Sequence, residues 1–219
     1  MSRLPILILL LVQAILLSAC NEPPPPTINL YRAIHIGDWD QVKRHLYRET
    51  DLTQRDPEGN LPLHVAARAG RLVIARSLVE HGADPNAVNA DGRSPVFIAL
   101  ANGKINLGEM LMKQGAGDDP QTLLFALAEA DVADRDGIAF LLRAGAEIDA
   151  LDAEGRSPLH IAVSAGRVLL AKQLVRAGAD VNLPDALGRT PMALAMEEGN
   201  KHIIALLQQY GASSAPIRQ

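Results

Sequence analysis

The sequence predicts an all-α fold in which about six helix-turn-helix units, joined by hairpin loops, stack into a solenoid. Three columns of residues predict it, because they recur in register with a period of 33. The columns hold alanine (Ala33, Ala66, Ala99, Ala162, Ala195), glycine (Gly37, Gly70, Gly103, Gly166, Gly199) and a Gly-Ala pair that begins at Gly82, Gly115, Gly145 and Gly178. A Gly-Arg-Ser/Thr-Pro phrase also recurs, beginning at Gly92, Gly155 and Gly188. A fixed period of this length is typical of stacked modules that share one continuous core.

The second unit shows how each element follows from its residues. Pro62 suits the first turn of a helix, where its missing N–H costs nothing, and Gly70 suits the left-handed cap that ends this helix. A second helix follows and ends at Gly82. Its apolar face, at helical spacing, consists of Ile74, Ala75, Leu78 and Val79. Residues 83–93 are rich in Asp, Asn, Gly and Pro, which predicts a hairpin.

Two pairs of segments carry a family resemblance: residues 61–67 (LPLHVAA) with 82–86 (GADPN), and residues 157–162 (SPLHIA) with 178–182 (GADVN). They resemble ankyrin repeats, and the resemblance covers roughly residues 27 to 214. It implies that partner proteins bind on the concave side, which hairpin tips and inner helices form. It also implies that the hydroxyl at a helix cap bonds the histidine three residues later, which steadies the turn.

Only the fifth unit keeps both members of that turn, as Ser157 and His160. The second unit has His64 but Leu61 at the cap. We therefore assign His64, Ser157 and His160 to structural turns, and we expect local stability to differ between units.

The fourth unit departs most from the period. The chain is about six residues too short for a hairpin between Gly115 and Leu123, and about three too long between Ala126 and Gly145. One hairpin, near Asp118 to Thr122, is therefore missing, and the extra residues are expected at 131–137, in the turn between helices. Two interpretations stay open: neutral drift in a tolerant loop, or a recess shaped for a partner.

The candidate protein-binding residues lie on hairpin tips, beside them, or on inner helices. They are Glu58, Asn60, Arg68, Asp91, Arg93, Phe97, Asn102, Glu154, Arg156, Leu187 and Arg189. Three of them, Arg93, Arg156 and Arg189, form what we call the arginine row. The row either grips partner carboxylates or is neutralised by its own carboxylates. Phe97, in the place of the turn histidine, either fills the core or contacts a partner.

The N-terminus has a different composition. Arg3 precedes an apolar run at 4–17, which is short for a membrane span of about 20 residues and typical of a secretory signal. Leu17-Ser18-Ala19-Cys20 resembles the lipobox of bacterial lipoproteins, so residues 1–19 are predicted to be the signal peptide and Cys20 the lipidated residue. The alternative is an ordinary signal with an incidental cysteine.

Residues 20–26 contain four consecutive prolines and predict an extended tether, rising about 3.1 Å per residue. It would hold the ankyrin-repeat domain, 27–219, roughly 20 Å from the membrane. Because Asn21 rather than aspartate follows Cys20, the resemblance to lipoproteins favours the outer membrane, facing the periplasm.

Catalytic chemistry finds little support in the sequence. The six histidines are scattered, and no metal-ligand, phosphate-loop or nucleophile-elbow motif is present. The 21 basic and 25 acidic side chains leave a net charge of −4, which does not indicate nucleic-acid binding. An Asp or Asn recurs three residues before the glycine of each hairpin, at Asp56, Asn89, Asp152 and Asp185, and is expected to form the turn.

We therefore expect a non-catalytic protein-binding module of the bacterial envelope, without metal, cofactor or small-molecule substrate. Its partner would be a periplasmic protein that it regulates, stabilises or inhibits, a toxin neutralised by an immunity protein being one case. The alternative is an envelope scaffold or cell-wall tether without a stoichiometric soluble partner.

Overall fold

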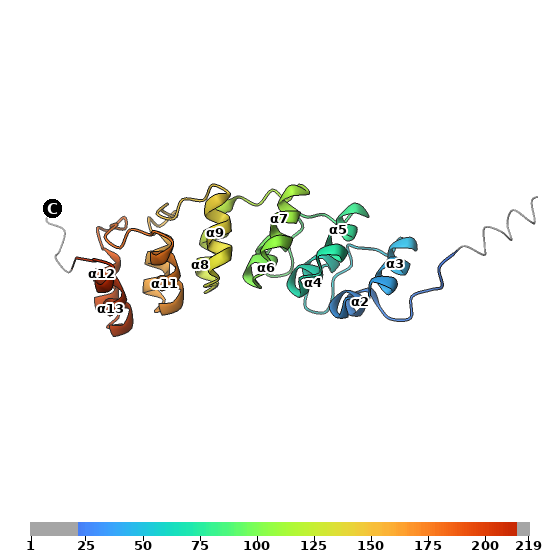
Figure 1. Cartoon of the computed structure of the whole chain (residues 1–219), viewed down its shortest axis with the longest axis horizontal. Helices are drawn as coiled ribbons and strands as arrows, with labels where there is room; N and C mark the ends of the chain where they lie inside the picture. Colours follow the sequence, from blue (N-terminus) through green and yellow to red (C-terminus); the bar gives the residue numbers. More distant parts are fainter. Residues whose placement is uncertain (1–21, 214–219) are drawn as a thin grey trace, which may run out of the picture.

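A computed structural model describes residues 22–213 as an elongated row of paired helices, which confirms the all-α solenoid (Figure 1). Each pair is an inner helix followed by an antiparallel outer helix. The pairs are α2 (Leu30–Ile36) and α3 (Trp39–Tyr47), α4 (Pro62–Ala69) and α5 (Leu72–Glu80), α6 (Pro95–Ala101) and α7 (Ile105–Lys113), α8 (Pro120–Glu129) and α9 (Arg135–Arg143), α10 (Pro158–Ser164) and α11 (Val168–Arg176), and α12 (Pro191–Glu197) and α13 (Lys201–Gln209). No strand occurs within these described residues.

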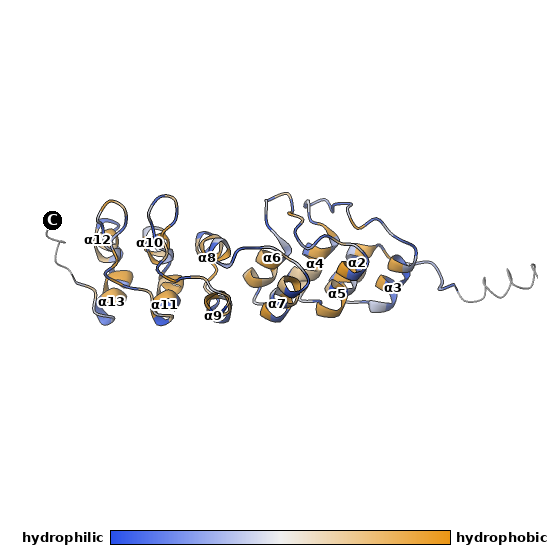
Figure 2. Ribbon diagram, turned by 90° about the horizontal axis from the view of Figure 1, so that it is seen from above, coloured by the Kyte–Doolittle hydropathy of each residue, from blue (hydrophilic) through white to orange (hydrophobic). Residues whose placement is uncertain are grey.

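The helices form two layers, and one hydrophobic core runs between them. Inner helices pack on inner helices along the whole row, and outer helices pack on outer helices except between α9 and α11, so each unit covers the apolar face of the next. Figure 2 shows the apolar sides of the two layers facing each other. Leu63, Leu100, Leu124 and Leu159 from successive inner helices are almost fully buried. Burying one such side chain contributes about 1.5–3 kcal/mol.

Caps at both ends fix the length of the inner helices. Proline occupies the first turn of α4, α6, α8, α10 and α12. The Ser94 and Thr190 hydroxyls accept hydrogen bonds from the backbone N–H three residues later. Left-handed glycines such as Gly70 (φ +68°) then turn the chain toward the outer helix.

The inner helix of the fourth unit follows the third unit after a short loop. Asp119 caps α8, its carboxylate accepting the Thr122 N–H at 2.8 Å, so the helix starts at Pro120. The loop from the preceding Gly115 to Asp119 is too short for a hairpin, as expected. The extra residues of this unit were expected only in the turn between its two helices. The structure divides them between that turn, which is longer than in the third unit, and the helix, because α8 has 10 residues and α6 has 7. Asp131 (φ +58°) takes the left-handed position that glycine holds elsewhere.

The segment before α2 is not helical and contacts the first unit. Arg48 donates to the Pro23 carbonyl at 3.4 Å, the Thr27 N–H donates to the Gln41 side chain at 2.8 Å, and the His45 Nε2 lies 2.8 Å from the Ile28 carbonyl. The end of the predicted tether thus lies against α3. Cys20 and the predicted signal peptide lie outside the described residues. Within 22–213, no helix has the length and hydropathy that a bilayer crossing requires.

Candidate protein-binding surface

Four hairpins precede inner helices, and each is closed by the Asp or Asn that the sequence singles out. The Asn89 N–H donates to the Arg93 carbonyl at 3.0 Å, and the Asn89 side-chain oxygen accepts the Arg93 N–H at 2.9 Å. Asp56, Asp152 and Asp185 close their hairpins in the same way. The expectation that these side chains form the turns is confirmed.

Neighbouring hairpins are joined by backbone hydrogen bonds, but the series is interrupted. The Ala90 N–H donates to the Gly59 carbonyl at 3.1 Å, and the Ala186 N–H donates to the Gly155 carbonyl at 3.1 Å. The fourth unit has no hairpin, so the equivalent carbonyl of Gly92 has no protein donor among the described residues. Figure 2 shows hairpins projecting on either side of α8 and none at α8. The helices of the third unit also pack less extensively on the fourth unit than on the second.

The arginine row is neutralised at two of its three positions. The Arg156 guanidinium lies 2.8 Å from the Asp152 carboxylate, and that of Arg189 lies 2.8 Å from the Asp185 carboxylate. Burial alone would raise the pKa of Asp185, but hydrogen bonds from the Arg189 backbone and side chain hold that pKa below its ordinary value. The interpretation that the row is neutralised by its own carboxylates therefore fits Arg156 and Arg189.

Arg93 is different, because its hairpin contains Asn89 instead of aspartate. No carboxylate in the described part of the chain lies within ion-pair distance of its guanidinium, which lies over the Phe97 ring at 5.1 Å from the centroid. Such a contact contributes about 0.5–1 kcal/mol at exposed sites. Phe97 is only 5% exposed, so it fills the core, but its ring also lines a cavity.

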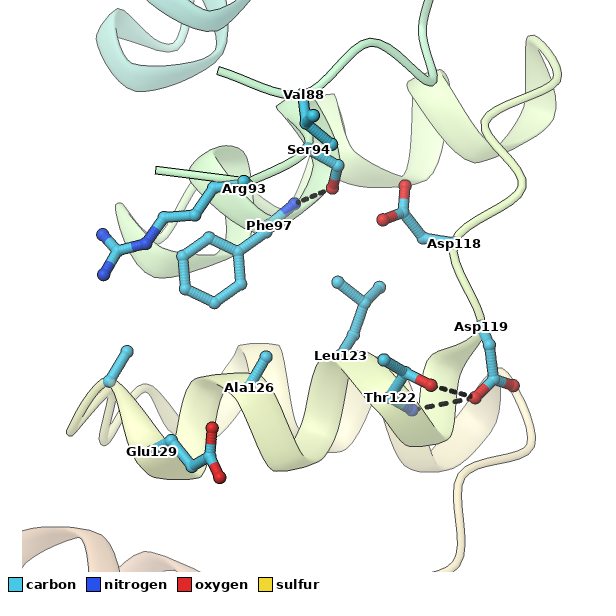
Figure 3. A pocket seen from close by; sticks show the side chains of 12 residues that line it. Val88, Arg93, Ser94, Phe97, Asp118, Asp119, Thr122, Leu123, Ala126 and Glu129 are labelled. Atoms are coloured by element: carbon cyan, nitrogen blue, oxygen red, sulfur yellow. Dashed lines mark hydrogen bonds between the residues drawn. The ribbon is translucent and has the colours of Figure 1, made fainter. Parts of the chain in front are cut away.

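That cavity, which we call the notch, has a volume of about 350 Å³ and lies between the third and fourth units, at the missing hairpin. Its lining includes Arg93, Phe97, Asp118, Thr122, Leu123 and Ala126. Figure 3 shows Phe97 from α6 and Leu123 from α8 pointing toward each other, with Arg93 and Asp118 on opposite sides of this apolar centre. The sequence located the gap but did not identify Asp118 or Leu123 as lining residues, because their place beside Phe97 depends on how α8 packs against α6.

The other predicted residues divide into exposed and buried positions. Those exposed are Glu58, Arg68, Asp91, Asn102, Glu154 and Leu187. Asn60 is 1% exposed, so it is buried and does not lie on the surface as predicted, and its side-chain oxygen accepts from the Asn89 amide at 3.1 Å. Several exposed members are paired with other candidates: Arg68 with Glu58 at 3.1 Å, and Arg156 with Glu154 at 3.2 Å.

The two turn histidines make hydrogen bonds within their own turn and to the next unit. The Ser157 hydroxyl lies 2.7 Å from His160 Nδ1, which also accepts the Ser157 N–H, and His160 Nε2 lies 3.2 Å from the Arg189 carbonyl in the next unit. His64 bridges to the Arg93 carbonyl at 3.0 Å although Leu61 offers no hydroxyl. Burial lowers the pKa of both rings. In the described residues, no group of three or more His, Cys, Asp or Glu side chains converges as a metal site would require.

A family model described as ankyrin repeats (3 copies) matches residues 30–122 and again 124–215. The chain belongs to the ankyrin-repeat family. It is therefore a protein-binding module. The two matches meet at the start of the fourth unit, beside the notch.

Among curated ankyrin-repeat relatives, the cyclin-dependent kinase 4 inhibitor B of Mus musculus is 37% identical over 119 residues, which is 51% of this chain and 88% of the relative. The human cyclin-dependent kinase inhibitor 2A is 38% identical, over 51% of this chain and 74% of the relative. Their names describe inhibitors of enzymes.

Two solved structures are similar over most of this ankyrin-repeat chain. The human ASB11 ankyrin repeat domain matches with a TM-score of 0.65 and 25% identity, covering 85% of each chain. A chain from a predatory endopeptidase of Bdellovibrio bacteriovorus in complex with an immunity protein matches with a TM-score of 0.61 and 25% identity, covering 82% of this chain and 96% of that one.

Proposed function

We propose that this ankyrin-repeat chain is a lipid-anchored, non-catalytic immunity or regulatory protein of the bacterial envelope, and that it holds a periplasmic enzyme inactive. The observation that carries the proposal is the similarity to the endopeptidase–immunity complex, because it extends over nearly the whole of both chains. The curated relatives named as kinase inhibitors support the same mode, in which a repeat surface binds an enzyme.

The surface that faces the partner is the side of the hairpin tips and inner helices. The exposed apolar side chains Leu187 and Val88 (76% and 46% exposed) lie on or beside the hairpins, among charged groups. Apolar contact area surrounded by charge is typical of specific interfaces between soluble partners. Envelope localisation and lipidation rest on the signal and Cys20 alone.

The proteins encoded by neighbouring genes are the candidate partners, and each is tested for binding to this chain. We expect one of them to form a one-to-one complex with this chain in size-exclusion chromatography with light scattering, and its enzymatic activity to fall as the complex forms. A variant with Arg93, Arg156 and Arg189 all changed to Glu tests the binding surface: it should keep its helix content and bind the partner less tightly. Co-sedimentation with cell wall in the absence of any soluble one-to-one complex would favour the scaffold instead.

The anchor is tested by fractionating cells that express single-residue variants. Cys20→Ser should move the protein from the membrane to the soluble fraction, because no thiol remains to be acylated. Ser18→Ala is the matched control, since it keeps a small residue before the cleavage point and should remain in the membrane. A Cys20→Ser protein that still sediments with membranes contradicts the anchor and leaves the binding proposal in place.

A further inference from the structure

We propose that the notch is the specificity pocket of this ankyrin-repeat surface, and that a loop of the partner protein fills it by taking the place of the missing hairpin. The loop inserts an apolar side chain between α6 and α8 and presents an adjacent Asp or Glu carboxylate to Arg93. The inference rests on the proposed function, since it assumes a protein partner.

The first argument is that the place of the missing hairpin is open. A Cβ atom built on Gly59 or Gly155 would lie 2.3 or 2.2 Å from the alanine Cβ of the next hairpin. Built on Gly92, it meets nothing within 4 Å, although Gly92 has the same left-handed conformation (φ +72°). The Gly92 carbonyl, which lines the notch, therefore faces an empty position where a partner backbone N–H fits.

The second argument is the apolar centre of the notch. Phe97, Leu123, Ala126 and Val88 line it from both sides (Figure 3). Its volume of about 350 Å³ is at the small end of the range of protein pockets, about 300–1,000 Å³. An aliphatic side chain on a tight loop matches such a space and supplies the kind of buried anchor that dominates interface energetics.

The third argument is charge, because Arg93 is the one cation among the lining residues and two of the three lining carboxylates, those of Asp119 and Glu129, are oriented elsewhere. Asp119 caps α8, and the Glu129 carboxylate lies 4.0 Å from Arg156 rather than at Arg93. Arg93 lacks the aspartate that neutralises Arg156 and Arg189, and its planar guanidinium can accept a carboxylate in bidentate geometry.

Asp118 supplies a complementary feature on the opposite side of the notch. Its Oδ2 atom is buried and has no hydrogen-bond donor among the described residues. An unsatisfied buried acceptor is unfavourable, and a rotation of the Asp118 side chain toward the notch would let a backbone N–H or hydroxyl of the inserted loop satisfy it. The loop is thus specified at three points: a donor toward Asp118, an apolar side chain in the centre, and a carboxylate toward Arg93.

The test uses a phage-displayed library of random peptides selected on the full chain, followed by affinity measurements on three proteins. We expect the selected peptides to place an apolar residue beside Asp or Glu. Arg93→Glu should weaken their binding about tenfold. The control Arg176→Glu makes the same charge reversal at an exposed position of the outer helix α11, away from the notch, and should change it less than about twofold. Selection on Arg93→Glu itself should replace the acidic residue with Lys or Arg.

A second variant tests the position without altering charge. Ala126→Trp fills the notch from α8, where Ala126 is only partly buried, and should abolish peptide binding while the helix content is retained. Peptides without a carboxylate, an affinity that is equal in Arg93→Glu and wild type, or the selection of no peptide would each overturn the inference. If the complex with the native partner forms with both Arg93→Glu and Ala126→Trp, the inference about the notch is wrong, but the proposed function is not contradicted. The absence of any native complex with the wild-type chain removes the proposed function itself.

Discussion

Alanine substitutions at three glycines in equivalent hairpin positions test directly whether the position of the missing hairpin is open. Gly59, Gly92 and Gly155 have φ values of +78°, +72° and +73°, so an alanine at any of them carries about 1–2 kcal/mol of left-handed strain. At Gly59 and Gly155 the new methyl group also overlaps the neighbouring hairpin, at 2.3 and 2.2 Å, and such overpacking costs about 1–3 kcal/mol more.

Gly155→Ala should therefore lower the free energy of unfolding by about 2–5 kcal/mol and Gly92→Ala by only about 1–2 kcal/mol. The assay is urea unfolding followed by circular dichroism, with Gly188→Ala as a second control because its Cβ also meets nothing within 4 Å. If Gly92→Ala destabilises the protein as much as Gly155→Ala does, then something covers Gly92 and the account of the notch is wrong.

Three further predictions concern the same scaffold. Burial lowers the pKa of His64 and His160, so as the pH falls these rings are protonated in the unfolded chain before they are protonated in the folded one. The free energy of unfolding should therefore fall as the pH drops below about 6.5, by up to about 1.4 kcal/mol per pH unit for each ring. The double variant His64→Gln, His160→Gln should show a weaker pH dependence in urea titrations. Ser157→Ala should cost about 1 kcal/mol in the same assay, because the buried turn loses its cap, and an unchanged midpoint would contradict that role. Amide hydrogen exchange should show α2–α7 and α8–α13 opening as two units, and uniform protection across the boundary would refute it.

The regular parts of the fold follow from the sequence because each unit repeats the same pair of helices with similar caps and a similar apolar face. Proline at a helix start and glycine at a left-handed cap act within a few residues, so the sequence reveals them. The fourth unit keeps the proline, as Pro120, but Asp119 replaces the hydroxyl cap and Asp131 replaces the glycine. The extra residues were consequently all assigned to the turn between the helices, whereas some of them lengthen α8.

The candidate surface was predicted in outline but not in its charge balance. Asp152 and Asp185 were recognised as turn formers, whereas their second carboxylate oxygen also binds the arginine four residues later. An aspartate four residues before an arginine is a pattern that can be seen in the sequence once this ion pair is known. The same pattern shows that Arg93, which has Asn89 at that position, lacks the pair. The burial of Asn60 was not visible, because it results from the amide of Asn89 in the next hairpin.

The interrupted hairpin series also affects how the surface can change over evolutionary time. In a continuous series, a substitution in one hairpin must fit the backbone of both neighbours, as Gly155 fits Ala186. On either side of α8 that constraint is absent. The hairpin that begins at Asn89 and the hairpin that begins at Asp152 are each free to vary on one side, so residues bordering the notch can follow changes in a partner at little structural cost.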